Sequence, residues 1–142
     1  MRHRLKTGVE IINLSSLVRL QALFATLSLT YLLASAVRQQ ITGEPLSAAA
    51  IGPSILMFLA YCGALFLPGI GKIGWYRTLM VPAFVLFGIG GVIGNIARYL
   101  DSGFAEYASF AAWAIAVTIN LFGTVLNVIA ALGLFRKKSD YD

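Results

Sequence analysis

The chain has 142 residues, of which 58% are hydrophobic and only 12% are charged. A soluble domain of this size needs far more charge on its surface, so the composition excludes that class and indicates an integral membrane protein. The net charge of +5 does not indicate a nucleic-acid partner, because the basic residues flank apolar segments, as membrane topology requires.

Residues 1–19 form a charged arm ahead of the first apolar segment. Leu5, Val9 and Ile12 fall on one helical face, with polar and charged residues on another. Two interpretations stay open: a short interfacial helix on the cytoplasmic membrane surface, or a helical extension of the first spanning segment.

Four apolar segments follow, at about residues 20–37, 48–67, 78–96 and 108–135. Each runs for roughly 18 residues or more without Asp, Glu, Lys or Arg, the length that crosses a hydrocarbon core of about 30 Å. Such segments must satisfy their own backbone in lipid, so we expect four transmembrane helices in an all-α bundle. The fourth is expected to be the longest, to tilt or to project beyond the bilayer, and a tail at 136–142 follows it.

The distribution of Lys and Arg predicts the orientation. Two connections carry one basic residue each, Arg38 and Arg98, and are expected to face outward. The arm, the middle connection and the tail should face the cytoplasm of a bacterial inner membrane, with both termini inside. Aromatic residues near the expected interfaces fit this reading: Trp75, Tyr76, Tyr99, Tyr107 and Trp113. The basic residues on the cytoplasmic side are Arg2, Arg4, Lys6, Arg19, Lys72, Arg77, Arg136, Lys137 and Lys138.

Several kinds of chemistry lack their residues. The single histidine, His3, lies outside the apolar segments, so no bis-histidine haem site is expected within the chain. The pattern predicts no metal site, no cofactor and no catalytic set. No carboxylate lies within a span, which argues against the mechanism of small four-helix proton-coupled drug exporters.

Small and amide residues form stripes on three of the expected helices. On the first, Gln21, Ala25, Ser28, Ser35 and Gln39 align; on the third, Gly88, Gly91, Asn95 and Arg98; on the fourth, Ala116, Asn120, Gly123, Asn127 and Ala131. Gly90 and Gly94 form a GxxxG pair on another face of the third helix.

These stripes have two interpretations. Small residues let helix backbones approach, and an amide in lipid finds a partner on an adjacent helix. The alternative is a narrow polar path or a ligand pocket between helices. We favour packing, and therefore expect Asn120 and Asn127 to join the fourth helix to a neighbour rather than line a pore.

The connections hold the remaining candidates. Lys72 and Arg77 are expected to meet anionic headgroups or the acidic residues of a partner, and Arg98 to meet the same kinds of group. Arg98, Asp101 and Glu106 could form a polar cluster, but we expect a solvated loop there.

Two short stretches resemble motifs of Fluc-type fluoride channels. GGVIGNIARYL at 90–100 resembles their GGxxGxxxRY segment, and INLFGTV at 119–125 resembles their VNxxGsF segment. The chain departs from that family because two apolar segments precede the first motif, no TTFST segment is present, and the charge bias opposes dual topology. We attribute the resemblance to glycine-rich helix packing; if it extends to function, Asn120 is the residue to test.

The sequence thus predicts a non-catalytic accessory or scaffold subunit, not an enzyme, that packs against other integral membrane subunits or copies of itself and contacts lipid. The alternative is a small homo-oligomeric channel or carrier with helix interfaces lined by Asn and Gly.

Overall fold

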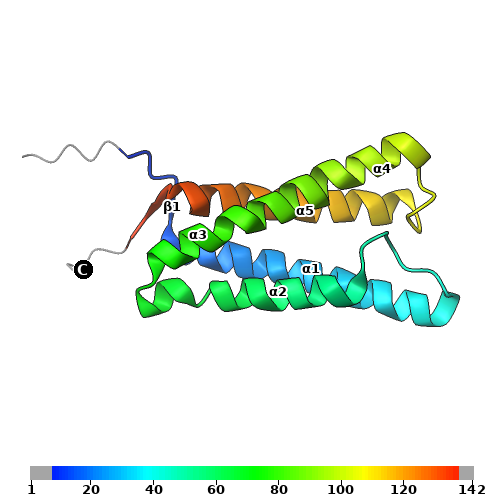
Figure 1. Ribbon diagram of the computed structural model, residues 1–142, viewed down its shortest axis with the longest axis horizontal. Coiled ribbons are helices and arrows are strands. Elements are labelled where there is room, and N and C mark those ends of the chain that lie inside the picture. Colours follow the sequence, from blue (N-terminus) through cyan, green and yellow to red (C-terminus); the bar gives the residue numbers. More distant parts are fainter. Residues whose placement is uncertain (1–7, 138–142) are drawn as a thin grey trace, which may run out of the picture.

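The computed structural model describes residues 8–137 and is built from four long helices that run side by side and alternate in direction (Figure 1). Each is long and apolar enough to cross a membrane. The first is α1 (Leu14–Thr42); the second comprises α2 (Ile51–Ala64) and the short 3-10 helix η1 (Leu67–Ile70); the third comprises α3 (Ile73–Phe84), the π-helix η2 (Val85–Ile93) and α4 (Gly94–Ser102); the fourth is α5 (Phe110–Leu132).

The four long apolar helices agree with the sequence, but their relative lengths do not. The first and third spans have 29 and 30 residues, whereas the fourth has 23, so the expectation that the fourth is the longest was wrong. The first and third continue past their apolar cores because the polar residues at their ends remain helical. The fourth ends early because Gly133 takes a positive φ of 71° and turns the chain out of α5.

The two described ends of the chain meet at one end of the bundle (Figure 1). Strand β1 (Ile12–Asn13) pairs in parallel with β2 (Phe135–Arg136), and the carboxylate of Glu10 lies 3.1 Å from the Arg136 guanidinium. Residues 8–13 are therefore not helical, which corrects both helical interpretations of this part of the arm. Residues 1–7 and 138–142, including the rest of the expected arm and tail, lie outside the described residues.

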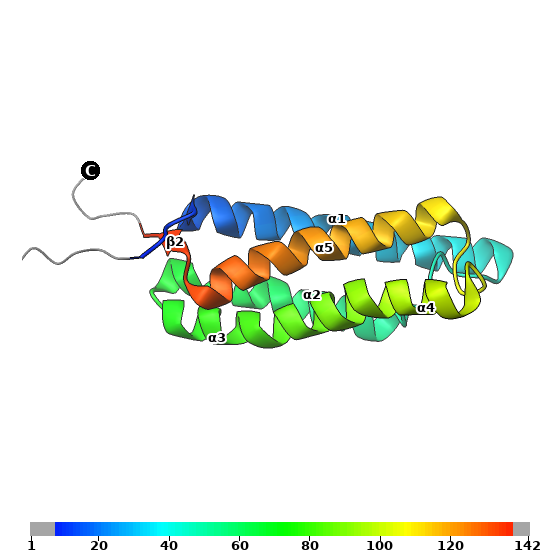
Figure 2. The same cartoon turned by 90° about the horizontal axis from the view of Figure 1, so that it is seen from above.

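The helices do not pack evenly around the bundle. Helix α5 packs against α1 and along α3 and η2, and α1 also packs against α2. Helix α2 meets α3 in only a few places, so the seam between the second and third spans is the loosest of the bundle. Figure 2 shows α5 lying across the bundle above the third span.

An aromatic cluster fills the centre of the fold. Phe24, Phe58, Tyr61 and Phe87 come from α1, α2 and η2, and their ring centroids lie 4.8–6.4 Å apart. All four are at least nine-tenths buried. Offset and edge-on pairs of this kind add to the packing that holds helices together in lipid, where there is no hydrophobic driving force.

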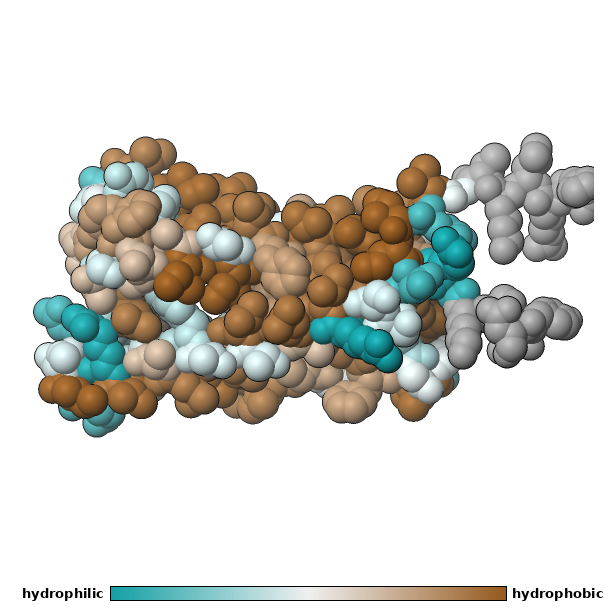
Figure 3. All heavy atoms as spheres, turned by 180° about the vertical axis from the view of Figure 1, so that it is seen from behind, coloured by the Kyte–Doolittle hydropathy of each residue, from teal (hydrophilic) through white to brown (hydrophobic). Residues whose placement is uncertain are grey.

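The surface between the two ends of the bundle is mostly apolar. In Figure 3, hydrophilic residues gather at the ends of this face, and hydrophobic residues cover most of the length between them. The exposed large side chains include Leu33, Leu56, Ile89 and Leu121. Such a surface suits lipid contact by its composition.

Candidate functional site: a buried polar network and a polar cavity

A hydrogen-bonded network of four side chains joins all four spans. Asn127 Oδ1 in α5 accepts a 3.0 Å hydrogen bond from Gln21 Nε2 in α1 and a 2.6 Å bond from the Tyr61 hydroxyl in α2. The Tyr76 hydroxyl in α3 donates to Gln21 Oε1. Gln21, Tyr76 and Asn127 are fully buried. Each buried oxygen of the two amides therefore has a donor, as a low-dielectric environment requires.

This network bears on the expectation for Asn127. Its amide oxygen does join α5 to neighbouring helices, and these helices belong to the same chain. The Asn127 Nδ2 group is buried without a hydrogen-bond partner among the described residues. The amide thus uses its acceptor fully within the bundle and leaves its donor unused there.

Asn120 behaves differently, which corrects the expectation that both amides bond to a neighbouring helix. Its Nδ2 donates at 2.8 Å to the carbonyl of Ala116, one turn back in the same helix. The side chain packs against Gly91 of η2, where an added Cβ atom would overlap it. Asn120 also lines a cavity, so it faces an open space rather than a partner amide.

Three of the predicted packing glycines do allow close approach within the chain. A Cβ atom at Gly123 would overlap the ring of Phe24, and one at Gly88 would stand 3.1 Å from a methyl group of Thr124. Together with Gly91, these glycines let α1 and η2 come close to α5.

The other two predicted packing glycines of the third span, Gly90 and Gly94, are open. A Cβ atom at Gly90 would meet nothing within 4 Å. One at Gly94 would make only ordinary contacts with its own span, with the Ile89 carbonyl and with Arg98. The GxxxG pair is therefore not covered by another helix of the described chain.

Asn95 organises the end of the bundle opposite to the strands. Its Oδ1 accepts from the Tyr107 hydroxyl, and its Nδ2 donates to the Gly91 carbonyl. The indole N–H of Trp113 donates at 3.0 Å to the backbone carbonyl of Asn95. Two aromatic residues that the sequence assigned to the interface, Tyr107 in the third connection and Trp113 in the first turn of α5, thus bond to α4 of the third span.

Arg98 pairs with the loop that follows it. Its Nε lies 3.6 Å from a Glu106 carboxylate oxygen, and both side chains are roughly half exposed. Two of the three residues of the possible polar cluster therefore pair at a loop that stays largely exposed, and such an exposed ion pair contributes little stability. Arg98 also lines the cavity described next.

The cavity has a volume of about 190 Å³ and lies between α1, α2, the third span and α5. Its wall is partly apolar, but it includes three serine hydroxyls, two amides and one guanidinium. The residues that line it are Ser28, Tyr31, Leu32, Ser47, Ala49, Ser54, Met57, Phe58, Leu86, Phe87, Gly90, Gly91, Asn95, Arg98, Ala116, Ile119 and Asn120.

One hydroxyl of this wall has no partner. Ser28 is 6% exposed, and its Oγ has no hydrogen-bond partner among the described residues. A buried hydroxyl in this state is unusual, because burial without a hydrogen bond costs free energy. Ser28 therefore places one unpaired buried hydroxyl beside the cavity, midway along α1.

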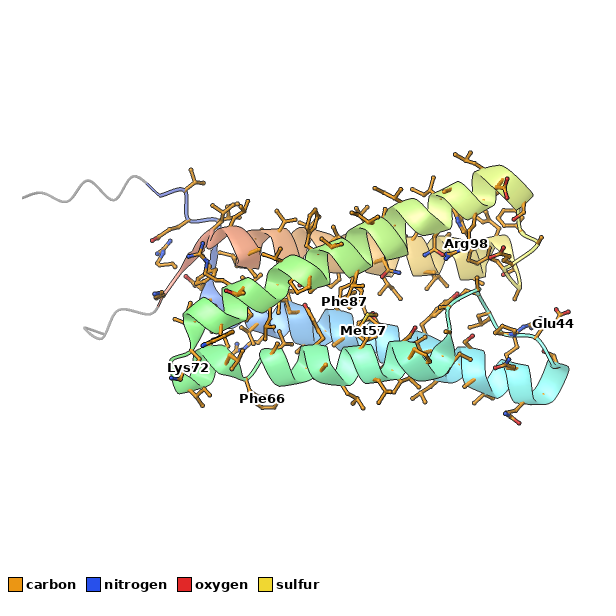
Figure 4. The ribbon with its side chains drawn as sticks, viewed as in Figure 1. Glu44, Met57, Phe66, Lys72, Phe87 and Arg98 are labelled. Carbon is orange, nitrogen blue, oxygen red and sulfur yellow. The ribbon has the colours of Figure 1, made fainter. Side chains whose placement is uncertain are left out.

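A second, apolar hollow adjoins the cavity along the seam between the second and third spans. It has a volume of about 160 Å³ and shares Met57, Leu86 and Phe87 with the first cavity. Figure 4 shows Met57 and Phe87 between the two spans, with Arg98 further toward the end away from the strands. The π-helix η2 supplies wall residues to both hollows, and π-helical turns are often found at functional sites.

The two basic residues of the middle connection take different places. The Arg77 guanidinium donates two 3.3 Å hydrogen bonds to the Ala131 carbonyl near the C-terminus of α5, so it stabilises that helix end within the chain. Lys72 is exposed beside η1 and remains open to a headgroup or a partner.

Two members of the buried network were not predicted as site residues. Tyr76 was assigned to the membrane interface, and Tyr61 was not singled out. The available signal was a phenol among apolar residues, since a buried tyrosine hydroxyl usually finds a partner. Gln21 was placed on the correct stripe of the first helix.

No group of three or more His, Cys, Asp or Glu side chains that could hold a metal lies within residues 8–137. Comparisons with family models, curated proteins and solved structures found no match to this chain.

Proposed function

We propose that the chain is a non-catalytic accessory or scaffold subunit that packs against other integral membrane subunits in a larger complex. The observation that carries this proposal is the open GxxxG pair, Gly90 and Gly94. In the same span, Gly88 and Gly91 face residues of α5, whereas a Cβ atom added at either glycine of this pair would contact no other helix of the described chain within 4 Å, and Gly90 borders the cavity.

The contrast matters because glycine in a helix is about 1 kcal/mol less favourable than alanine. Gly88 and Gly91 offset that cost by letting α5 approach. Gly90 and Gly94 would offset it if a helix of another subunit approached them, as small-xxx-small motifs allow. Exposed apolar residues beside them, Ile89 and Ile93, could extend that contact.

We further propose that the subunit resides in a bacterial inner membrane with both termini in the cytoplasm. Nine of the eleven Lys and Arg residues flank the spans on the side that carries both chain ends, which supports this orientation. The meeting of β1 and β2 at one end of the bundle is compatible with it.

The partner proposal is tested by affinity purification of the full chain from its own membrane in a mild detergent. Gly94→Leu places bulk on the open face, and Gly63→Leu makes the same change on α2, where an added Cβ atom meets nothing within 4 Å. We expect integral membrane subunits to copurify in fixed ratio with the wild type and Gly63→Leu, and to be lost with Gly94→Leu. Equal recovery with all three chains, or recovery of the chain alone, would contradict the proposal.

A homo-oligomeric channel or carrier is the second candidate, because Asn120 and Arg98 line the same cavity. Phe58 and Phe87 of the aromatic cluster also line it, so a continuous path would have to pass around these rings. Solute or fluoride flux in liposomes, abolished by Asn120→Leu while assembly stays intact, would favour this candidate over the first.

A further inference from the structure

The polar cavity lies at one particular level of the bundle. Its residues from α1 begin at Ser28, midway along that helix, those from α5 include Ala116, and Arg98 lies in the last helix of the third span. Figure 4 shows α4, which carries Arg98, separated from α2 at this level. The cavity therefore borders the loose seam and extends from the middle of the bundle toward the end opposite to β1 and β2.

The cavity suits an anionic or strongly polar group. Among the described residues, Arg98 supplies the only charged side chain of its wall, and Ser28 supplies a buried hydroxyl without a partner. Ser54 adds a second hydroxyl from α2. A volume of about 190 Å³ corresponds to roughly six water molecules at about 30 Å³ each, which is enough for a phosphate-sized group.

The adjoining hollow suits the opposite chemistry. It follows the same seam toward the strand end, and its wall includes Ala60, Ala64, Leu79 and Ala83. Its wall, among the described residues, carries no charged side chain, and it shares three residues with the wall of the cavity. The two hollows therefore form one continuous groove that is polar at one end and apolar at the other.

We propose that this groove binds one membrane phospholipid with an anionic headgroup, with the phosphate beside Arg98 and an acyl chain along the seam between the second and third spans. The lipid belongs to the leaflet at the end away from the strands. The proposal requires the membrane location of the chain, but it does not require a partner subunit.

Two other occupants fit the groove less well. An α-helix of another subunit is about 10–12 Å across with its side chains, too wide for a cavity of about 190 Å³. A free inorganic anion would use Arg98 but would leave the apolar hollow to other lipid, and would gain nothing from the continuity of the two hollows.

Glu106 sets the charge that the headgroup meets. Its carboxylate pairs with Arg98 at 3.6 Å and partly neutralises it. The headgroup and Glu106 therefore compete for the same guanidinium, so removal of the acid should strengthen binding of an anionic lipid. If Arg98 and Glu106 had merely structural roles, removing one would not weaken lipid binding while removing the other strengthens it.

Native mass spectrometry of the purified full chain in a neutral detergent tests the proposal. The chain is titrated with palmitoyl-oleoyl phosphatidylglycerol, with the phosphatidylcholine of the same acyl chains, and with inorganic phosphate. We expect one tightly bound phosphatidylglycerol, about tenfold weaker binding of phosphatidylcholine, and no retained phosphate. Equal binding of the two lipids, or phosphate binding as tight as that of phosphatidylglycerol, would overturn the proposal.

Three variants locate the bound lipid. Arg98→Gln should weaken phosphatidylglycerol binding about tenfold and leave phosphatidylcholine unchanged, and Glu106→Gln should strengthen phosphatidylglycerol binding by about two- to threefold. Gly90→Leu fills open space at the cavity wall and should abolish the tight equivalent. Gly63→Leu is the matched control and should not change it.

The variants also separate this proposal from the accessory-subunit proposal, since lipid binding is measured on the isolated chain. Wild-type binding by Gly90→Leu, or an equal effect of Gly63→Leu, would place the lipid elsewhere and overturn the inference. Loss of bound lipid on addition of a copurified subunit would assign the groove to a protein partner instead.

Discussion

The hydroxyl of Tyr61 in α2 donates a 2.6 Å hydrogen bond to Asn127 Oδ1 in α5, and thereby joins two helices whose backbones make little contact with each other. The same oxygen accepts from Gln21 in α1. One amide oxygen thus connects three helices at a point where no water is expected. Because the bilayer offers no alternative partner, this acceptor is the centre of the polar network.

The first prediction contrasts the two asparagines of α5. Asn127→Leu removes the acceptor for two buried donors, and leaving buried groups unpaired costs about 1–3 kcal/mol. Asn120→Leu removes only a bond within its own helix and should cost less than about 1 kcal/mol. Reversible unfolding of the purified chain in mixed micelles measures both. If the two variants lost equal free energy of unfolding, the network around Asn127 would stabilise the fold no more than the hydrogen bond of Asn120 within its own helix does.

The second prediction concerns the contact of Gly123 with Phe24. Gly123→Leu drives a side chain into the space that the Phe24 ring occupies, so we expect a loss of about 1–3 kcal/mol or failure to fold. Gly63→Leu is the matched control, because a side chain at that position meets open space. In the double variant, Phe24→Ala should restore part of the stability that Gly123→Leu removes, because it vacates the space that the leucine enters. If the double variant is as unstable as the two single losses added together, the two sites are independent.

The third prediction addresses the bond between Tyr76 and Gln21. Tyr76→Phe removes one hydroxyl and leaves the ring in place, so it tests the hydrogen bond without a large change in packing. Combined with Gln21→Leu in a double-mutant cycle, it should give a coupling energy of about 0.6 kcal/mol, and no more than about 1.7 kcal/mol. A coupling energy of zero would mean that the bond contributes nothing to the fold.

The fourth prediction is the orientation of the chain. In a Cys62→Ser background, cysteine at Glu44 or Asp101 should react with a membrane-impermeant thiol reagent from outside the cell, and cysteine at Lys137 should not. All three positions are exposed. Gly43 and Gly103 are avoided because both have positive φ, which a cysteine would strain. The reverse labelling pattern would invert the topology.

Parts of the candidate site were readable from the sequence, and parts were not. The stripe of Gln21 and Ser28 on the first helix and the stripe of Gly123 and Asn127 on the fourth were identified by the helical period alone, and these residues are buried in the bundle. The helical period does not determine which of these residues contact one another across helices. Asn120 and Asn127 are seven residues apart on one face, yet one reaches two neighbouring helices and the other bonds to its own.

The sequence by itself determined the class of the protein, its four spans and the faces that carry small and polar residues, because hydrocarbon thickness and the helical period act on each segment alone. Only the tertiary structure decided the partners: Tyr76 inside the network rather than at the interface, Arg77 on the end of α5, and Arg98 beside both Glu106 and the cavity. These outcomes depend on the rotation and relative height of each helix. Rotation and height are set by the packing of side chains from several helices at once, which no single segment encodes.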